Sequence, residues 1–337
     1  MTANGRTARP RARAAVPCRA CLSGEDLDWL GGRSVSLALD LRTTVEIPAE
    51  PPAEPGLPGP PGPPGPPRPS AQEAESGWPA QVWAWLRRRL PDAGLAARPP
   101  AVTVHSDAPA ASGLSSSTAL IVALFRAFTD ACAPEPRISA RTLAQWAYEF
   151  EFAVFNGGGM DHLAVIAGDA LLIQGRTTGL PLIREQARFP DEWAVLVVDS
   201  ATRKDTGDHI RTVRARLAAG DPRLSAYTAR TDETSAAVWE ALGARDLGAL
   251  GAAMSGAHGA MRDLQGMSTE VLEELRVLAL RATGLPLKLS GAGGGGALVG
   301  VCRAAERETI AKALREAYRP VRPGARVIPA EAAPGLD

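Results

Sequence analysis

A run of small and hydroxyl-bearing residues lies in the middle of the chain, at residues 109–119 (PAASGLSSSTA), here called the serine loop. It follows an alternating strand-like segment and opens a long apolar segment typical of a buried helix. Gly113 permits a backbone turn that is closed to other residues. Ser115, Ser116 and Ser117 place hydroxyl and N–H groups at the predicted helix N-terminus, which favours an anion such as phosphate. The alternative is a single serine cap on a buried helix.

Two glycine-rich segments could bring backbone close to a ligand. The glycine loop, residues 290–296 (SGAGGGG), lies between two strand-like pieces, and it either approaches a ligand or another loop or is a flexible hairpin. The second segment, residues 156–162 (NGGGMDH), leads to a carboxylate, Asp161, which acts as a base, as an electrostatic partner or only as a helix cap. Neither GxGxxG opening a helix nor GxxxxGK[ST] occurs, so dinucleotide-binding and Walker-type loops are disfavoured.

Ionisable side chains gather between residues 19 and 32 (RACLSGEDLDWLGG), in a turn between strand-like stretches. They are Arg19, Glu25, Asp26 and Asp28. Residues 25–29, here called the carboxylate turn, would accept hydrogen bonds from vicinal hydroxyls if they formed a binding site. The alternative is a solvated hairpin tip.

The composition excludes several classes of protein. Lys+Arg and Asp+Glu are equal at 37 each in 337 residues, which argues against a chain whose main partner is a nucleic acid or an anionic membrane. The longest apolar run, residues 119–125, is too short to span a bilayer, and the basic N-terminus lacks the apolar core of a secretory signal. Cys18 and Cys21 have no second cysteine pair, so a metal or redox role is disfavoured. We therefore expect a cytoplasmic globular protein.

The remaining segments predict a mixed fold. Helices are expected at residues 78–90, 118–132, 139–155, 232–254 and 268–283, with Ser139 as an N-cap. Strands are expected at residues 35–39, 43–47, 101–105, 164–166, 170–173, 193–198, 287–289 and 297–302. Helices and strands mix without strict βαβ alternation, which favours the α+β class.

The order of the motifs, rather than any one of them, resembles the GHMP small-molecule kinases, in their galactokinase branch. The resemblance rests on SGEDLDWLGG, SDAPAASGLSSSTAL, AYEFEFAVFNGGGMDH and LGALGAAMSGAHGAMRD, and it covers most of residues 17–320. It implies an α+β, two-domain GHMP kinase fold with the active site in the interdomain cleft, and transfer of the ATP γ-phosphate to a small alcohol. We expect a disordered basic arm (1–16), an N-terminal domain (17–190) with a Pro-rich surface loop (48–69), and a C-terminal domain (191–337).

The resemblance also implies roles for single residues. Asp161 matches the catalytic aspartate and Arg19 the arginine beside the reacting hydroxyl. Matching sugar-contacting positions are Glu25, Asp26, Asp28, Gly158, Gly159 and His209. The ATP site would comprise Ser112, Gly113, Leu114, Ser115, Ser116 and Ser117, with Trp78 or Trp83 near the adenine. Ser117 and Glu149 would hold Mg²⁺, because that ion prefers hard oxygen ligands.

Two departures from the galactokinase pattern bear on the substrate. The chain has E-D-L-D-W where galactokinases have E-H-T-D-Y, so Asp26, an acceptor only, replaces a histidine that contacts the far end of the sugar. The glycine loop is SGAGGGG rather than TGGGFGG. We therefore expect a sugar 1-kinase for a modified or higher-carbon aldose of a natural-product (antibiotic) pathway, working as a monomer or homodimer. The alternatives are a galactokinase proper, a GHMP kinase for a non-sugar alcohol, and a non-catalytic sugar sensor.

Overall fold

The computed structural model describes residues 11–49, 77–132, 136–202 and 206–336. Its first sheet has the order β1-β2-β4-β5, and β3 pairs with the far half of β2; all pairings are antiparallel. The strands are β1 (Ala12–Ser23), β2 (Arg33–Ile47), β3 (Thr103–Ser106), β4 (Ala170–Gln174) and β5 (Leu182–Ala187). The tip between β1 and β2 holds the short helix α1 (Leu27–Leu30) and therefore the carboxylate turn.

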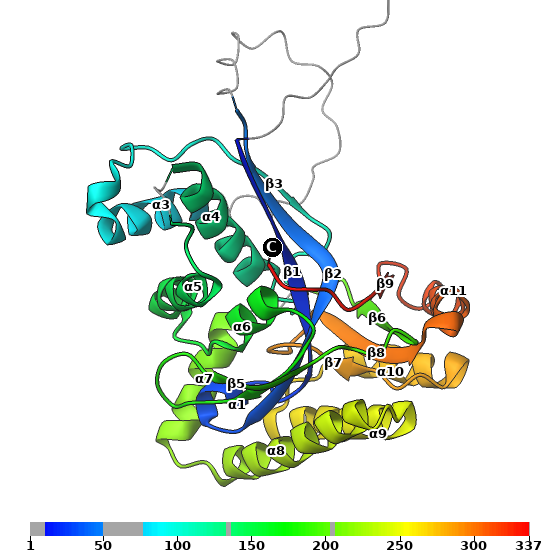
Figure 1. Cartoon of the computed structure of the whole chain (residues 1–337). Helices are drawn as coiled ribbons and strands as arrows, with labels where there is room; N and C mark the ends of the chain where they lie inside the picture. Colours follow the sequence, from blue (N-terminus) through cyan, green and yellow to red (C-terminus); the bar gives the residue numbers. More distant parts are fainter. Residues whose placement is uncertain (1–10, 50–76, 133–135, 203–205, 337) are drawn as a thin grey trace, which may run out of the picture.

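Four helices cover the first sheet and build its core. They are α3 (Trp78–Arg89), α4 (Ser116–Cys132), α5 (Ala140–Phe155) and α6 (Met160–Ala167). In Figure 1 they stand together along one side of the long β1–β2 ribbon. Residues 118–129 of α4 are all buried, because the helix is apolar on every side and lies between β1, β2 and the other helices. A short 3₁₀ turn, η1 (Pro91–Ala93), follows α3.

The second sheet has the antiparallel order β7-β8-β6-β9. Its strands are β6 (Trp193–Asp199), β7 (Lys288–Leu289), β8 (Ala297–Arg303) and β9 (Arg326–Ala330). The helices of this half are α7 (Thr206–Ala218), α8 (Pro222–Gly243), α9 (Leu247–Ala260), α10 (Glu270–Thr283) and α11 (Arg307–Tyr318). A π turn, η2 (Met261–Gln265), follows α9, and a 3₁₀ turn, η3 (Ala304–Glu306), precedes α11. Alternate residues of β6 enter two different cores: Val195 and Val197 join the core of the first sheet, while Leu196 and Val198 pack with α10 and α11.

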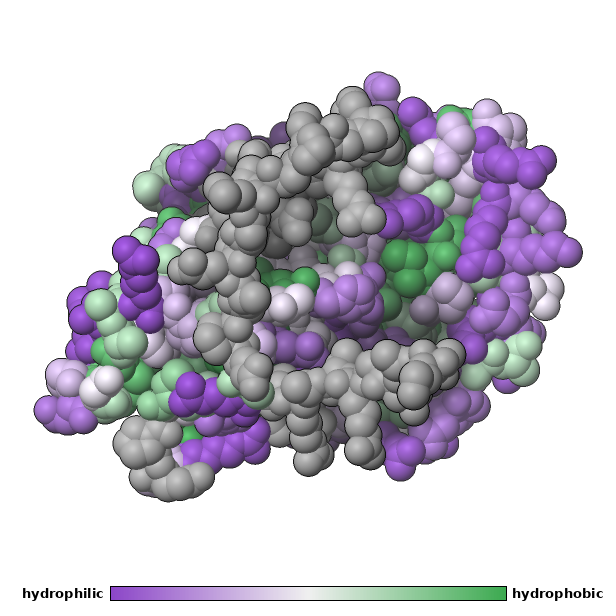
Figure 2. Space-filling model, turned by 90° about the horizontal axis from the view of Figure 1, so that it is seen from above, coloured by the Kyte–Doolittle hydropathy of each residue, from purple (hydrophilic) through white to green (hydrophobic). Residues whose placement is uncertain are grey.

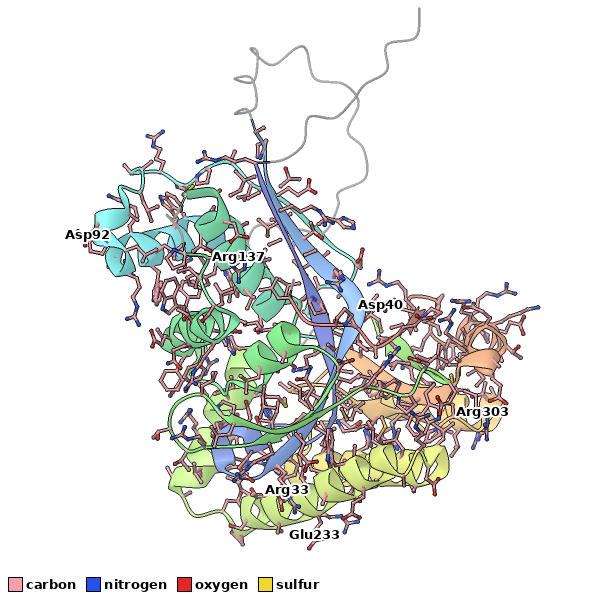
Figure 3. All side chains as sticks on the ribbon, in the orientation of Figure 1. Arg33, Asp40, Asp92, Arg137, Glu233 and Arg303 are labelled. Atoms are coloured by element: carbon pink, nitrogen blue, oxygen red, sulfur yellow. The ribbon has the colours of Figure 1, made fainter. Side chains whose placement is uncertain are left out.

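The two halves of the chain are joined at several places. Arg33, at the lower end of β2, lies beside α8 (Figure 3), and its guanidinium pairs with Asp232 of that helix. After β9 the chain returns to the first half, where Leu39 and Ala332 form a bridge. Seen from above, hydrophilic side chains make up most of the visible outline, with a smaller hydrophobic area between them (Figure 2). The chain passes from the first sheet to the second between β5 and β6, near the expected boundary at residue 190, which stays a prediction.

The structure confirms most of the expected elements and corrects four. Ser139 is the N-cap of α5, and its Oγ accepts a hydrogen bond from the backbone N–H of Thr142 (3.1 Å). Residues 12–16, expected in a disordered arm, belong to β1, because they pair with distant residues of β2. Residues 164–166 are helical, since so short an apolar run does not distinguish a helix from a strand. The single helix expected at 232–254 is two, α8 and α9, and the two strand pieces at 35–39 and 43–47 are one, β2. Residues 1–10 and 50–69 of the expected arm and Pro-rich loop lie outside the described residues.

Candidate active site

The serine loop, the carboxylate turn and the glycine loop meet at one cavity of about 460 Å³, a size suited to a small molecule. The catalytic and turn residues named from the sequence all line it: Arg19, Glu25, Asp26, Asp28 and Asp161. Gly113, Ser115, Ser116, Ser117, Trp78, Gly158 and His209 line it as well. Residues from distant parts of the sequence are therefore brought together around one space.

The serine loop is held in an unusual backbone shape by groups from both halves of the chain. Gly113 and Ser115 have positive φ angles (82° and 59°), and α4 begins at the next residue, Ser116. The guanidinium of Arg19 donates to the carbonyl of Gly113 (2.6 Å). The N–H of Ala297, just after the glycine loop, donates to the carbonyl of Ser112 (2.7 Å). The loop thus presents the N-terminus of a 17-residue helix to the cavity, which suits an anion.

Asp161 lies in the first turn of α6, with both carboxylate oxygens in use. Oδ1 accepts from Arg19 Nε (2.8 Å), and Oδ2 accepts from the hydroxyl of Ser115 (2.6 Å). Burial alone would raise the pKa of Asp161, but the Arg19 guanidinium and the two hydrogen bonds outweigh burial, so the pKa is lowered. Asp161 is therefore a carboxylate at neutral pH, fixed in place beside the serine loop.

Asp28 is a buried carboxyl group that lines the same cavity, near Asp161. Its Oδ2 accepts from the N–H of Met160 (2.9 Å), and Gly158 packs so closely that a Cβ there would lie 1.9 Å from the same oxygen. Burial raises the pKa of Asp28 to about 7, and the negative charges of Asp161 and Asp26 add to this effect. Two neighbouring carboxyl groups with pKa values shifted in opposite directions are typical of sites that use them for different tasks.

Asp26 of the carboxylate turn pairs with His209, and both residues line the cavity. Asp26 has a left-handed backbone (φ 66°) and makes no side-chain hydrogen bond to cap α1. Its carboxylate instead lies 2.7 Å from Nε2 of His209, on α7, and both side chains are mostly buried. A strained backbone that serves a long-range pair at a cavity is a sign of a functional constraint.

Two residues predicted for the site, Glu149 and Trp83, are not among the residues that line the cavity, and their roles stay predictions. Glu149 faces outward on α5, where it accepts from Gln145 (3.0 Å) and lies 3.6 Å from Arg89. Trp83 is buried in the core, and its indole N–H donates to the carbonyl of Ala96 (3.0 Å). In both cases the helix turns the side chain away from the cavity, whereas Trp78, the other tryptophan predicted for the adenine, lines it.

Three other predicted residues are buried next to lining residues and do not line the cavity themselves. Ser112, Leu114 and Gly159 are buried in the backbone that shapes it, and they are not among the lining residues. Five further lining residues belong to segments singled out from the sequence but were not named individually: Trp29, Ala111, Met160, Gly291 and Ala292. Three more were missed: Glu151, Gly207 and Ile210. Of these, Glu151 had a detectable signal, because it lies two positions after Glu149 in the same motif.

Glu151 lies two positions after Glu149 on the same helix, α5. It lines the cavity together with Ser117, accepts a hydrogen bond from Thr118 Oγ1 (2.9 Å) and lies 2.8 Å from Nε2 of buried His162. A hydroxyl and a carboxylate are hard oxygen donors of the kind Mg²⁺ prefers. Among the residues the structure describes, no three His, Cys, Asp or Glu side chains gather as a metal site. An ion here would therefore need nucleotide phosphates as further ligands, which is usual for Mg²⁺.

The comparisons with known proteins agree with this geometry. Residues 80–169 match the sequence profile of the GHMP kinases N terminal domain, and residues 260–320 match that of the GHMP kinases C terminal domain. Galactokinase of Mycobacterium tuberculosis strain H37Rv is 28% identical over 342 aligned positions, which cover 90% of this chain and 92% of that protein. Galactokinase of Thermococcus kodakarensis is 24% identical, covering 91% and 94%.

Solved structures show the same fold at lower identity. Lactococcus lactis galactokinase complexed with galactose superposes with a TM-score of 0.72 at 16% identity, covering 97% of this chain and 94% of that chain. The L. major mevalonate kinase in complex with R-mevalonate gives 0.73 at 18%, covering 97% and 98%. Among the described residues, no helix is long and apolar enough to cross a membrane. The expected fold class is confirmed, and the chain belongs to the GHMP kinase superfamily, within which its sequence is galactokinase-like.

Proposed function

We propose that this kinase transfers the γ-phosphate of ATP to the anomeric (C1) hydroxyl of a free sugar. The observation that carries the proposal is the position of Asp161. Its carboxylate is held ionised by Arg19 and Ser115 at the meeting point of the serine loop and the carboxylate turn. This is where a phosphate donor and a hydroxyl acceptor would have to meet.

The two sides of the cavity suit the two substrates. The N-terminus of α4 and the serine loop offer backbone N–H and hydroxyl groups to the triphosphate, with Trp78 at the edge of the same cavity for the adenine. The carboxylate turn offers acceptors to sugar hydroxyls. An acceptor without the matching hydroxyl would leave those buried carboxylates unpaired, which gives strong discrimination.

Asp161 and Arg19 would serve the phosphoryl transfer itself. Asp161 orients the attacking hydroxyl and accepts its proton, a role that contributes about 10²–10⁴-fold in enzymes of this kind. Arg19 keeps Asp161 ionised and offers positive charge to the transferring group. Ser117 and Glu151 would hold Mg²⁺, which when bound neutralises charge on the phosphates.

The pair formed by Asp26 and His209 supports an acceptor other than plain galactose. In the sequence pattern of galactokinases this position of the turn is a histidine, whereas here it is a carboxylate engaged with His209 of α7. An acceptor that reaches this end of the cavity meets a hydrogen-bonded ionisable pair instead of a lone ring. We propose a modified or higher-carbon aldose as the substrate.

The test is an ADP-release assay with Mg·ATP and a panel of free aldoses, with mevalonate and homoserine as non-sugar alcohols. We expect turnover of an aldose, a sugar 1-phosphate as product, and no turnover of the matching methyl glycoside, whose anomeric hydroxyl is blocked. Asp161→Asn is expected to lose at least about 100-fold in kcat while it still binds ATP. The exposed Asp191→Asn is the matched control. Turnover confined to the non-sugar alcohols, or an undiminished Asp161→Asn variant, would overturn the proposal.

A further inference from the structure

One lysine of the described chain is completely buried, directly behind the carboxylate turn. Lys288, on β7, has no exposed surface. Its ammonium donates to the carbonyls of Cys21 (3.1 Å) and Leu289 (2.6 Å) and forms an ion pair with the carboxylate of Glu25. A lysine ammonium has three donors, and these three partners use all of them.

Glu25 uses its two carboxylate oxygens differently. Oε1 receives the Lys288 ammonium and also the N–H of Gly291 (3.3 Å). Oε2 is buried and has no hydrogen-bond partner among the described residues. Glu25 itself is only 3% exposed, and it is among the residues that line the cavity. A buried carboxylate oxygen without a donor is costly, so an oxygen left in this state beside a cavity indicates a place for a ligand donor.

A purely structural ion pair would explain less. Buried ion pairs are weak evidence for stability, because desolvation offsets much of their attraction. A pair kept only for stability would also be expected to satisfy both oxygens of its carboxylate. Here the protein commits two donors to Oε1 and none to Oε2. The arrangement fixes the direction of the carboxylate and leaves Oε2 without a donor from the described residues.

The place of Lys288 in the chain makes it a rigid support. The next residue, Leu289, donates its N–H to Nδ1 of buried His258 (3.1 Å). The hydroxyl of Ser290 accepts from the N–H of Cys21 (3.1 Å) and donates to the carbonyl of Gly113 in the serine loop (3.2 Å). The ammonium therefore bonds to a residue of each sheet, and Ser290, two residues further on, ties the same segment to the serine loop.

We propose that Lys288 is a positioning residue for the acceptor: it holds Glu25 so that Oε2 accepts a hydrogen bond from a hydroxyl of the substrate. This inference rests on the proposed function, and it adds a residue that lies outside the cavity and outside the motifs. Without the ammonium, Glu25 would be a buried carboxylate with only the Gly291 N–H as a donor, and it would turn or take up a proton. Acceptor binding would then weaken while nucleotide binding would not.

The experiment compares three variants in steady-state kinetics with the aldose that the wild-type chain phosphorylates. Lys288→Met removes the charge and keeps a similar length, Lys288→Arg keeps the charge, and Lys312→Met makes the same change at an exposed lysine of α11. We expect about a tenfold or larger rise in the acceptor KM of Lys288→Met, with the ATP KM changed less than about threefold. Lys288→Arg should recover most of the loss, and Lys312→Met should match the wild type.

The outcomes separate the two proposals. If the wild-type chain phosphorylates no aldose, the proposed function fails and this inference fails with it. If the wild type is active and Lys288→Met keeps its acceptor KM, or both KM values rise together, the positioning role alone is overturned. Failure of both Lys288→Met and Lys288→Arg to fold, judged by circular dichroism and thermal unfolding, would also overturn it, because the lysine would then serve stability only.

Discussion

The two sides of the cavity are built on different principles. On the serine loop, the groups that face the cavity are backbone N–H groups, hydroxyls and a helix N-terminus, held in place by backbone hydrogen bonds such as the one from Ala297 to Ser112. On the carboxylate turn, the groups are charged side chains, and each one depends on a partner far away in the sequence. Asp26 depends on His209 and Glu25 on Lys288.

This difference follows from what each side would bind. A triphosphate is the same for every kinase that uses ATP, so a local cradle of backbone N–H groups and hydroxyls suffices. A sugar differs from its relatives by single hydroxyls, and only precisely oriented side chains distinguish them. Apart from Ser115 and Ser117, the serine loop should therefore tolerate substitutions that keep its backbone, and the carboxylate turn should be sensitive to small changes at distant contacts.

The largest expected effect is at Gly158, which touches the carboxylate turn. In Gly158→Ala the new Cβ would lie 1.9 Å from Asp28 Oδ2 and 2.3 Å from its Cγ, so the Asp28 carboxyl has to move. We expect kcat/KM for the acceptor to fall by about 100-fold or more, since a displacement of about 1 Å at an acceptor group costs that much. Binding of ATP alone, measured by calorimetry, should change little. Equal losses for both substrates would show that the two sides are not independent.

A matched pair of glutamates tests where the metal ligand lies. Glu151→Gln removes a carboxylate that lines the cavity with Ser117, whereas Glu149→Gln changes one that faces Gln145 and Arg89. We expect Glu151→Gln to need at least about tenfold more Mg²⁺ for half-maximal rate, and Glu149→Gln to match the wild type. The reverse result would support the prediction made from motif spacing.

The contrast between the two sides also decides what the sequence could predict. The serine loop is local: its glycine, its serines and the helix that follows are consecutive, so both its position and its ligand class could be predicted. Of the carboxylate turn, the sequence predicted the residues but not their partners. Lys288 lies 263 positions from Glu25, and no local pattern connects them.

Helix rotation explains why Glu149 and Trp83 do not line the cavity. Glu149 and Glu151 are two positions apart on α5, and residues so spaced point to different faces of a helix. Spacing counted from Asp161 runs through Gly157 and the left-handed residue Asn156, whose turn resets the phase of the helix relative to the site. Trp83 and Trp78 differ in the same way along α3, one buried in the core and one at the cavity.

The two carboxyl groups predict a pH dependence that separates the sides. The pKa of Asp28 is raised to about 7, while that of Asp161 is lowered. We expect kcat/KM for the acceptor to rise roughly tenfold as pH rises through about 7, because ionised Asp28 is the better hydrogen-bond acceptor. Asp28→Asn should remove this inflection. An inflection that persists in Asp28→Asn would assign it to another group.

The same shift predicts the opposite trend for stability. A carboxyl whose pKa is raised on folding stabilises the folded state when protonated, so its contribution is full below the unfolded pKa, near 4, and is lost as pH rises through about 7. Relative to the wild type, Asp28→Asn should therefore gain in Tm between pH 5 and pH 8. Thermal unfolding of the two proteins across this range checks the sign.

The smallest expected effect is that of replacing an alanine by glycine on the serine loop, the reverse of Gly158→Ala. Ala111 lines the cavity with a left-handed backbone (φ 55°), a conformation that costs a residue with a Cβ about 1 kcal/mol. Ala111→Gly should raise the free energy of unfolding by up to about 1 kcal/mol, or Tm by roughly 2 °C, with the KM of both substrates nearly unchanged. Ala110→Gly, next to it but without a positive φ, is the control and should lose stability. A large loss of activity in Ala111→Gly would show that even this small, unpaired side chain of the serine loop is needed, which would weaken the contrast with the carboxylate turn.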